Sequence, residues 1–237
     1  MRVRRARVIS RVIFGDVPCA ICKTAKARRF CPGVHEEICT ACCGKGREET
    51  IDCPLTCEYL AEAHKHEKKP ASDPEAMPGK DVPIDDEFLH TNEFLIVLLG
   101  SALSEASRPH PNATDADAVA ALDSLAATWR SQIAGVIYET KPVNPIAADL
   151  FEGFQARVED IRERMKKADS EQSLPDQTVL GVLVFLQRVA FGLNNGRSKC
   201  KAFLVFLSQF YVDMKAEEEE EATLVSDVSD DGPRVIL

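Results

Sequence analysis

The cysteines constrain this chain more than any other feature of its sequence. Eight of the nine lie between Cys19 and Cys57, spaced as Cys-x2-Cys, Cys, Cys-x2-Cys-Cys and Cys-x3-Cys. Thiolates two or three residues apart converge readily on one tetrahedral ion, at about 2.3 Å per Zn–S bond, because a tight turn directs both side chains inward. The spacing therefore predicts a small module with two zinc ions, and the predicted ligands are Cys19, Cys22, Cys31, Cys39, Cys42, Cys43, Cys53 and Cys57.

Two pairings of these ligands fit the spacing. In a crossed pairing, Cys19 and Cys22 share one ion with the 39–43 group, and Cys31, Cys53 and Cys57 share the other with His35 or a remaining cysteine. In a sequential pairing, one site is Cys39, Cys42, Cys53 and Cys57, and the other is Cys19, Cys22, Cys31 and Cys43. Either pairing gives each ion four protein ligands and no open position for water, which is typical of structural zinc.

Disulfides and an iron–sulfur cluster are the alternative uses of these cysteines. The first fourteen residues contain five arginines, and Arg11 interrupts the place where a hydrophobic core would form, so we expect no secretory signal. We therefore expect a cytoplasmic protein, in which the reducing environment disfavours disulfides. An iron–sulfur cluster also takes four thiolates, and spacing alone does not separate it from zinc.

The stretch from Arg28 to Leu60, RRFCPGVHEEICTACCGKGREETIDCPLTCEYL, resembles the N-terminal segment of a group of uncharacterised bacterial cysteine-rich proteins. The order of the cysteine pairs, with FCPG at Phe30 to Gly33, also resembles the small two-zinc fingers of the HIT and MYND type and, more loosely, the RING type. The resemblance implies a treble-clef or cross-brace finger. The terminal His-x3-Cys of the MYND pattern is missing, and Cys31 has no cysteine two or three residues further on, so the resemblance implies no ubiquitin-ligase activity.

Composition divides the chain into five parts. We predict a basic N-terminal segment over residues 1–15, a zinc-binding module over 16–66, a linker over 67–84, a helical bundle over 85–215 and an acidic tail over 216–237. The linker is predicted from its prolines and its few apolar residues. The tail contains five consecutive glutamates, and such a run is normally solvated.

The fold class predicted for the whole chain is mainly α. After the linker, apolar residues recur at every third or fourth position, which predicts an antiparallel bundle of about five helices with Trp129 in its core. Cys200 lies away from the cluster and is predicted to be an ordinary thiol. The predicted helix starts are Asp85 or Asp86, Thr114 or Asp115, Asn144 followed by Pro145, Pro175, and a last helix from Ser198.

No motif of a known enzyme class occurs in the sequence. The chain contains no His-Glu-x-x-His, Walker phosphate loop, Gly-x-Ser-x-Gly or dinucleotide-binding glycine pattern. Thiol-redox chemistry at Cys43, beside Lys45, is the enzymatic alternative. Because metal ligation explains the same residues, we predict a binding protein without catalytic activity.

Charge favours a protein partner over nucleic acid. Residues 1–69 hold 14 Lys and Arg against 9 Asp and Glu, whereas residues 70–237 hold 15 against 29. Two zinc ions on eight thiolates would lower the charge of the first part from +5 to about +1. We therefore expect a protein-interaction adaptor, with a nucleic-acid-binding zinc finger as the alternative. No apolar run is long enough to predict a membrane span.

Overall fold

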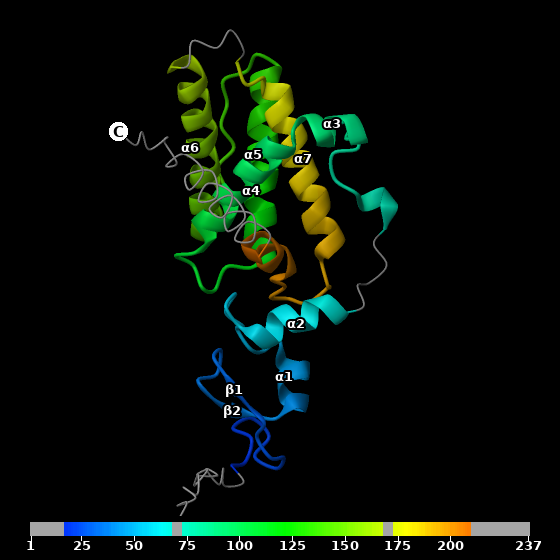
Figure 1. The fold of residues 1–237 in the computed structure, drawn as a ribbon, viewed down its shortest axis with the longest axis vertical. Coiled ribbons are helices and arrows are strands. Elements are labelled where there is room, and N and C mark those ends of the chain that lie inside the picture. The colour runs from blue at the N-terminus through cyan, green and yellow to red at the C-terminus, as the bar shows by residue number, and fades with distance from the viewer. Residues whose placement is uncertain (1–16, 68–72, 168–172, 210–237) are drawn as a thin grey trace, which may run out of the picture. The chain divides into compact units, whose positions relative to one another are not determined.

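The structure is a computed structural model that describes residues 17–67, 73–167 and 173–209 (Figure 1). The chain divides into two compact units, Met1–Cys53 and Pro54–Leu237. This division comes after Cys53, earlier in the chain than the predicted linker over 67–84. The predicted basic segment over 1–15 and the acidic tail over 216–237 lie outside the described residues.

The N-terminal unit contains a hairpin followed by a short helix. β1 (Arg29–Cys31) pairs antiparallel with β2 (Glu36–Ile38), and Phe30 lies opposite Glu37. α1 (Thr40–Gly46) follows β2 directly. Cysteines make up most of the buried hydrophobic set in residues 17–53, which is Cys19, Cys31, Ile38, Cys39, Cys43, Ile51 and Cys53.

The C-terminal unit is helical, which confirms the predicted fold class. Its elements are α2 (Glu58–His66), the short 3-10 helix η1 (Pro74–Ala76), α3 (Asp86–Thr91), α4 (Glu93–Ser107), α5 (Asp115–Ile133), α6 (Pro145–Lys167), α7 (Asp176–Leu193) and a helical segment over residues 202–209 at the end of the described chain. Helices α3 to α7 and the segment over residues 202–209 contribute side chains to one continuous hydrophobic core or pack against it, and α2 and η1 precede them in the chain.

Local side-chain caps set most of the helix starts. The Asp85 side chain accepts from the amide of Phe88, and Thr114 forms a capping box with Asp117. The Asn144 side chain accepts from the amide of Ile146 at 2.8 Å. These caps confirm three predicted helix starts, and α7 confirms a fourth because it begins directly after Pro175.

One predicted helix is divided in two. Asn92 separates α3 from α4: its φ of −112° and ψ of 15° depart from helical values, and its side-chain amide donates to the carbonyl oxygen of Phe88. Asparagine competes with the helical backbone in this way through its short polar side chain. The periodicity of the segment that begins with Glu87 contains no sign of this interruption.

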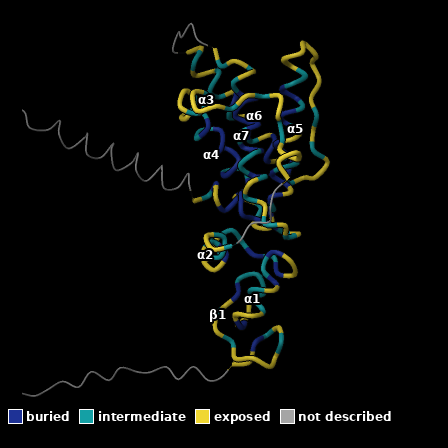
Figure 2. The backbone as a smooth tube through the Cα atoms, turned by 90° about the vertical axis from the view of Figure 1, so that its right-hand side faces the viewer, coloured by how far each residue is buried: buried dark blue, intermediate teal, exposed yellow. Residues whose placement is uncertain are grey.

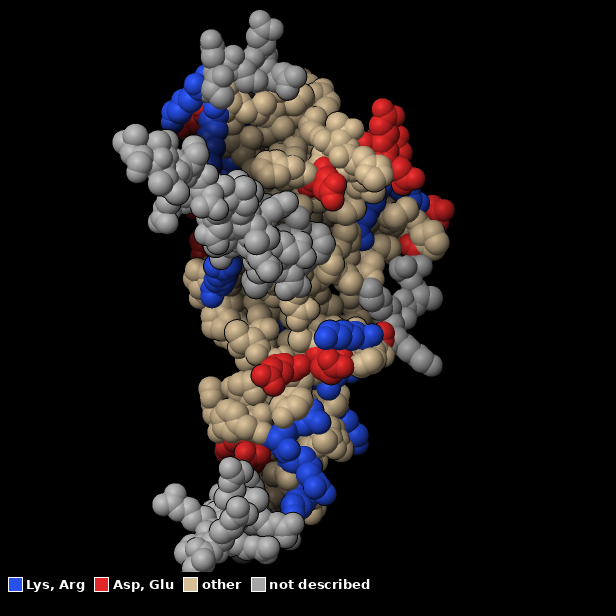
Figure 3. Space-filling view, viewed as in Figure 1, with Lys and Arg blue, Asp and Glu red and all other residues tan. Residues whose placement is uncertain are grey.

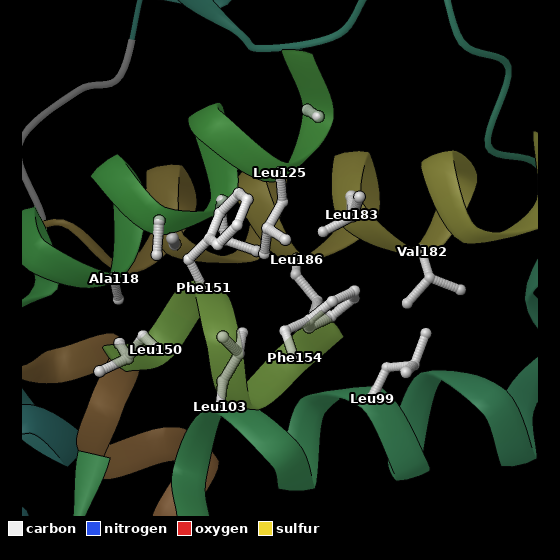
Figure 4. Packing of buried hydrophobic residues seen from close by; sticks show 14 of the residues in the cluster. Leu99, Leu103, Ala118, Leu125, Leu150, Phe151, Phe154, Val182, Leu183 and Leu186 are labelled. Carbon is white, nitrogen blue, oxygen red and sulfur yellow. The ribbon is translucent and has the colours of Figure 1, made fainter. Parts of the chain in front are cut away.

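The core lies between α4, α5, α6 and α7 (Figure 4). Phe151 and Phe154 of α6 are fully buried, and the ring of Phe154 meets Trp129 edge-on with the centroids 6.2 Å apart. Burying one such side chain contributes about 1.5–3 kcal/mol. The prediction that Trp129 belongs to the core is confirmed. α7 is long and apolar enough to cross a membrane, but half of it is buried in this core, which accounts for its composition.

The helices α5 and α6 run in the same direction, whereas α6 and α4 are antiparallel. The capping residues at the starts of α5 and α6 lie together, because Asn144 donates from its side chain to Asp117. The connection over residues 134–144 must therefore return along the length of α5 before α6 begins (Figure 1). The short-loop argument for an antiparallel bundle does not hold for this connection.

The second half of the predicted linker packs against the bundle. Arg188 of α7 donates to the carbonyl oxygens of Gly79 and Val82 at 2.8 and 2.9 Å. Val82 and Ile84 also pack against the hydrophobic core. The described part of the predicted linker, residues 73–84, is therefore partly buried against the helices and belongs to the helical unit.

Candidate metal centre

Four cysteines of the N-terminal unit gather around one point. The sulfur atoms of Cys19, Cys22, Cys39 and Cys42 all lie within 4.8 Å of one another. Tetrahedral coordination with Zn–S bonds of about 2.3 Å places the sulfurs about 3.8 Å apart, so a small contraction would let all four ligate one ion. These four residues could therefore hold a metal ion.

A tight turn positions the first pair of ligands. The amide of Cys19 donates to the carbonyl of Ala25 at 2.8 Å, and the amide of Lys23 donates back to the carbonyl of Cys19 at 2.8 Å. Lys23 takes a positive φ of 56°, which reverses the chain directly after Cys22. Both thiols consequently face the same side of the turn.

The start of α1 positions the second pair. Cys39 is the N-cap residue, and its sulfur accepts from the amide of Cys42 at 3.4 Å. Residues three apart at a helix start lie on one face, so both sulfurs point the same way. The amide of Ala20 donates to the carbonyl of Glu37 at 3.0 Å, which fixes the first turn against the strand that leads into α1.

The surroundings shift the pKa values of three of these thiols, and in different directions. The Thr24 side chain, together with the amides of Ala25 and Thr24, lowers the pKa of Cys22 to about 5. Burial opposes ionisation of Cys19, but the amides of Cys22, Cys39 and Ile21 outweigh it and lower its pKa. A hydrogen bond with Cys39, followed by burial, raises the pKa of Cys42 to about 12. Cysteine spacing alone does not predict the effect of Thr24 on the pKa of Cys22. A hydroxyl two residues after a candidate ligand is nevertheless a sequence feature from which such a hydrogen bond could be predicted.

The grouping agrees with the first ion of the crossed pairing and differs from both sites of the sequential pairing. The other predicted ligands, Cys31, Cys43, Cys53 and Cys57, form no comparable group of three within the described residues. Cys57 is the N-cap of α2 and belongs to the other unit. A second ion on these four cysteines stays a prediction.

Two residues named as alternatives have other surroundings. His35 is exposed with a positive φ of 60°, and its amide donates to the carbonyl of Cys31 at 2.8 Å, but its side chain does not belong to the four-cysteine group. Cys43 is buried, and a guanidinium nitrogen of Arg29 lies 3.7 Å from its sulfur. A buried thiol is poorly placed to exchange with a second thiol, which weakens the thiol-redox alternative.

No family model, curated protein or solved structure matches this chain. The geometry of the centre must therefore carry the functional argument. Among the described residues, no fifth His, Cys, Asp or Glu side chain joins these four thiols. A set of four thiolates is typical of structural metal sites, in which no position is left open for water.

Proposed function

We propose that this protein binds one structural zinc ion through Cys19, Cys22, Cys39 and Cys42, and that the module so formed binds another protein in the cytoplasm. The convergence of the four sulfur atoms carries the metal proposal. Zinc is the metal that tetrahedral four-thiolate sites most often hold in structural modules. A HIT-like or MYND-like finger, as the cysteine order suggests, is part of this proposal.

The charge of the module supports a protein partner over nucleic acid. Residues 17–53 contain six Lys and Arg against five Asp and Glu, and both signs lie on the face drawn in Figure 3. One zinc ion with four thiolates adds a net −2. The metallated module is therefore close to neutral, whereas phosphate recognition requires a clear positive excess.

Exposed apolar side chains beside the metal centre support the same conclusion. Phe30 is 53% exposed and Ile21, inside the first ligand turn, is 45% exposed. They lie near each other, because Ala20 donates to Glu37, the strand partner of Phe30. Aromatic and aliphatic side chains held on a rigid scaffold are typical anchors of protein interfaces.

Metal analysis of protein purified without added metal tests the first half of the proposal. We expect at least one equivalent of zinc per chain, and a cobalt-substituted protein with the intense visible bands of tetrahedral thiolate ligation. Cys19→Ser should abolish that spectrum, whereas Cys200→Ser should leave it unchanged because Cys200 is not part of the four-cysteine group. Iron with visible cluster absorbance, or less than half an equivalent of any metal, would refute the zinc proposal.

Crosslinking of the full chain to its partner tests the second half. Phe30→Ala should abolish the crosslinked product. Phe94→Ala is the matched control, since Phe94 is 71% exposed but belongs to the other unit. Sub-micromolar binding to DNA or RNA at physiological salt that is lost in a Lys23→Ala/Arg28→Ala variant would instead establish the nucleic-acid alternative.

A further inference from the structure

The connection between α5 and α6 is an extended segment on the surface of the bundle. It returns along α5: the amide of Val136 donates to the carbonyl of Ser131 at 2.8 Å, and the amide of Thr140 donates to the hydroxyl of Thr128 at 3.0 Å. Figure 2 shows this connection as a largely exposed tube beside α5. One side of this connection is therefore hydrogen-bonded to α5, and its other side is open, as in the edge strand of a sheet.

In this connection, backbone N–H groups that donate a hydrogen bond alternate with N–H groups that donate none. The amide of Tyr138 donates to the carbonyl of Val136, which closes a γ-turn centred on Ile137, so the run that can pair as a strand begins at Tyr138. The amide of Thr140 is used by Thr128, and Pro142 has no N–H. The intervening amides of Ile137, Glu139, Lys141 and Val143 donate no hydrogen bond to any described residue. In an extended chain successive N–H groups point to opposite sides, so the amides of Glu139 and Lys141 point away from α5. Such a row of free groups is a template for strand pairing.

Large apolar side chains flank this edge without any cover. Ile137 is 103% exposed and Val143 is 100% exposed, and Tyr138 between them is 64% exposed. A single exposed apolar residue is ordinary, but several on one extended segment are typical of an interaction site. The segment therefore combines free backbone donors with uncovered apolar groups.

The sequence of the segment is complementary to itself about Thr140. An antiparallel pair of two copies centred on this residue sets Glu139 opposite Lys141 and Ile137 opposite Val143. Each of these pairs occurs twice, because the symmetry axis exchanges the two copies. In the single chain the ammonium of Lys141 is only loosely placed, 4.0 Å from Glu139 and 3.9 Å from Glu152.

We propose that residues 138–142 pair with the same residues of a second copy of this chain, forming a short two-stranded antiparallel ribbon across a two-fold axis, with Ile137 and Val143 flanking it. The hydrogen-bond pattern of such a ribbon fits the alternation. Thr140 then occupies a pair without backbone bonds, as its engaged amide requires, and Tyr138 faces Pro142 in another. The free amides of Glu139 and Lys141 fall at the hydrogen-bonded pairs.

A second copy fits this edge better than an unrelated strand does. A chance partner would have to present both an apolar residue and a charge of the correct sign at each matching position. The chain itself does so, because opposite charges and apolar residues lie at equal distances on either side of Thr140. Since only one strand per copy takes part, the interface is small and the dimer should be weak and concentration-dependent.

Charge reversal and mixing test this pairing on the full-length, metal-loaded protein. Sedimentation velocity over a concentration series should show reversible dimerisation of the wild type. Lys141→Glu places glutamates opposite each other, and Glu139→Lys places lysines opposite each other, so each variant alone should dimerise at least about tenfold more weakly. An equimolar mixture of the two variants restores both opposite-charge pairs and should form the heterodimer with wild-type affinity.

Two further variants make the result specific. The double variant Glu139→Lys/Lys141→Glu exchanges the charges within one chain and should dimerise like the wild type. Lys166→Glu, at an exposed position of α6, is the charge-matched control and should have no effect. Circular dichroism melting curves confirm that each variant is folded. A wild type that remains monomeric up to about 1 mM, or a mixture that fails to regain association, overturns the proposal.

Discussion

The carboxylate of Asp115 stabilises a helix that lies far from it in the sequence. Its two oxygens accept from the amides of Phe203 and Leu204 at 2.9 and 3.1 Å, and the thiol of Cys200 donates to it at 3.1 Å. These amides belong to the first turn of the helical segment over residues 202–209, where helical backbone leaves donors without partners. Asp115 therefore acts as the N-cap of that segment, in place of a neighbouring residue.

Truncation of this side chain should be costly, because Asp115 is only 6% exposed and water cannot take over its role. Asp115→Ala leaves two buried amides unsatisfied at about 1–3 kcal/mol each, so we expect a loss of about 2–5 kcal/mol in the free energy of unfolding. Asp115→Asn retains one acceptor but turns an NH2 group toward the other amide, and should lose about 1–3 kcal/mol. Asp86→Asn, an exposed acid in the first turn of α3, should lose less than about 1 kcal/mol.

Urea denaturation followed by far-ultraviolet circular dichroism measures these losses, with zinc held in excess. Hydrogen exchange adds a local readout, since the amides of Phe203 and Leu204 should lose protection in the Asp115 variants before the rest of the core does. A loss below about 1 kcal/mol for Asp115→Ala, or unchanged protection of the two amides, would refute the assignment of Asp115 as their cap.

Two further predictions concern the helical unit. Arg188→Ala removes the side chain that donates to the carbonyl oxygens of Gly79 and Val82. Trypsin should therefore cut the folded protein after Lys80 at least about tenfold faster than in the wild type. An unchanged rate of cleavage would show that these hydrogen bonds do not hold the segment in place. Burial, with the nearby Asp115 carboxylate, raises the pKa of Cys200 to about 12. Because this pKa is higher in the folded than in the unfolded protein, the protonated thiol makes its full contribution to the free energy of unfolding below the unfolded pKa of about 9. That contribution is lost as the pH rises toward the folded pKa of about 12. Stability should therefore fall from about pH 9 toward pH 12 more steeply in the wild type than in Cys200→Ala, and equal slopes would contradict this.

The sequence was most informative where structure is decided by neighbouring residues. Caps such as Thr114 with Asp117 are complete within four residues, and the four helix starts predicted from such local signals are found. The same holds for the candidate metal centre, whose possible ligands come as two local pairs, Cys19 with Cys22 and Cys39 with Cys42. Spacing alone did not show which two pairs join, because that depends on how the hairpin brings the turn to α1.

Features that depend on distant residues could not be read from the sequence. The last helix was predicted from Ser198 but begins at residue 202, because its cap comes from Asp115 and not from a local side chain. Lys201 is fully buried, with its ammonium donating to the carbonyl of Pro111, although lysine is ordinarily read as a surface residue. The parallel course of α5 and α6 likewise follows from long-range bonds of the 134–144 connection.

The composition of the two cores predicts that the proposed metal ion is needed to fold only the N-terminal unit. In residues 17–53 the buried hydrophobic side chains are cysteines apart from Ile38 and Ile51, and fully burying two isoleucines contributes only about 3–6 kcal/mol. Ordering a chain of this length costs far more, so under the proposed function a bound ion would supply the difference. The helical unit has a large apolar core of its own around α7 and does not need the metal.

Removal of the metal by a chelator should therefore unfold the N-terminal unit and leave the helical unit folded. On removal of zinc, amides of residues 17–53 should lose their protection from hydrogen exchange, whereas far-ultraviolet circular dichroism should retain most of its helical signal. Cys39→Ser should reproduce this loss without a chelator, because it removes both a ligand and the N-cap of α1. Cys200→Ser serves as the matched control and should keep the N-terminal amides protected. Survival of that protection after complete metal removal would show that the cysteines pack without an ion. Collapse of the helical signal would show that the bundle depends on the metal as well.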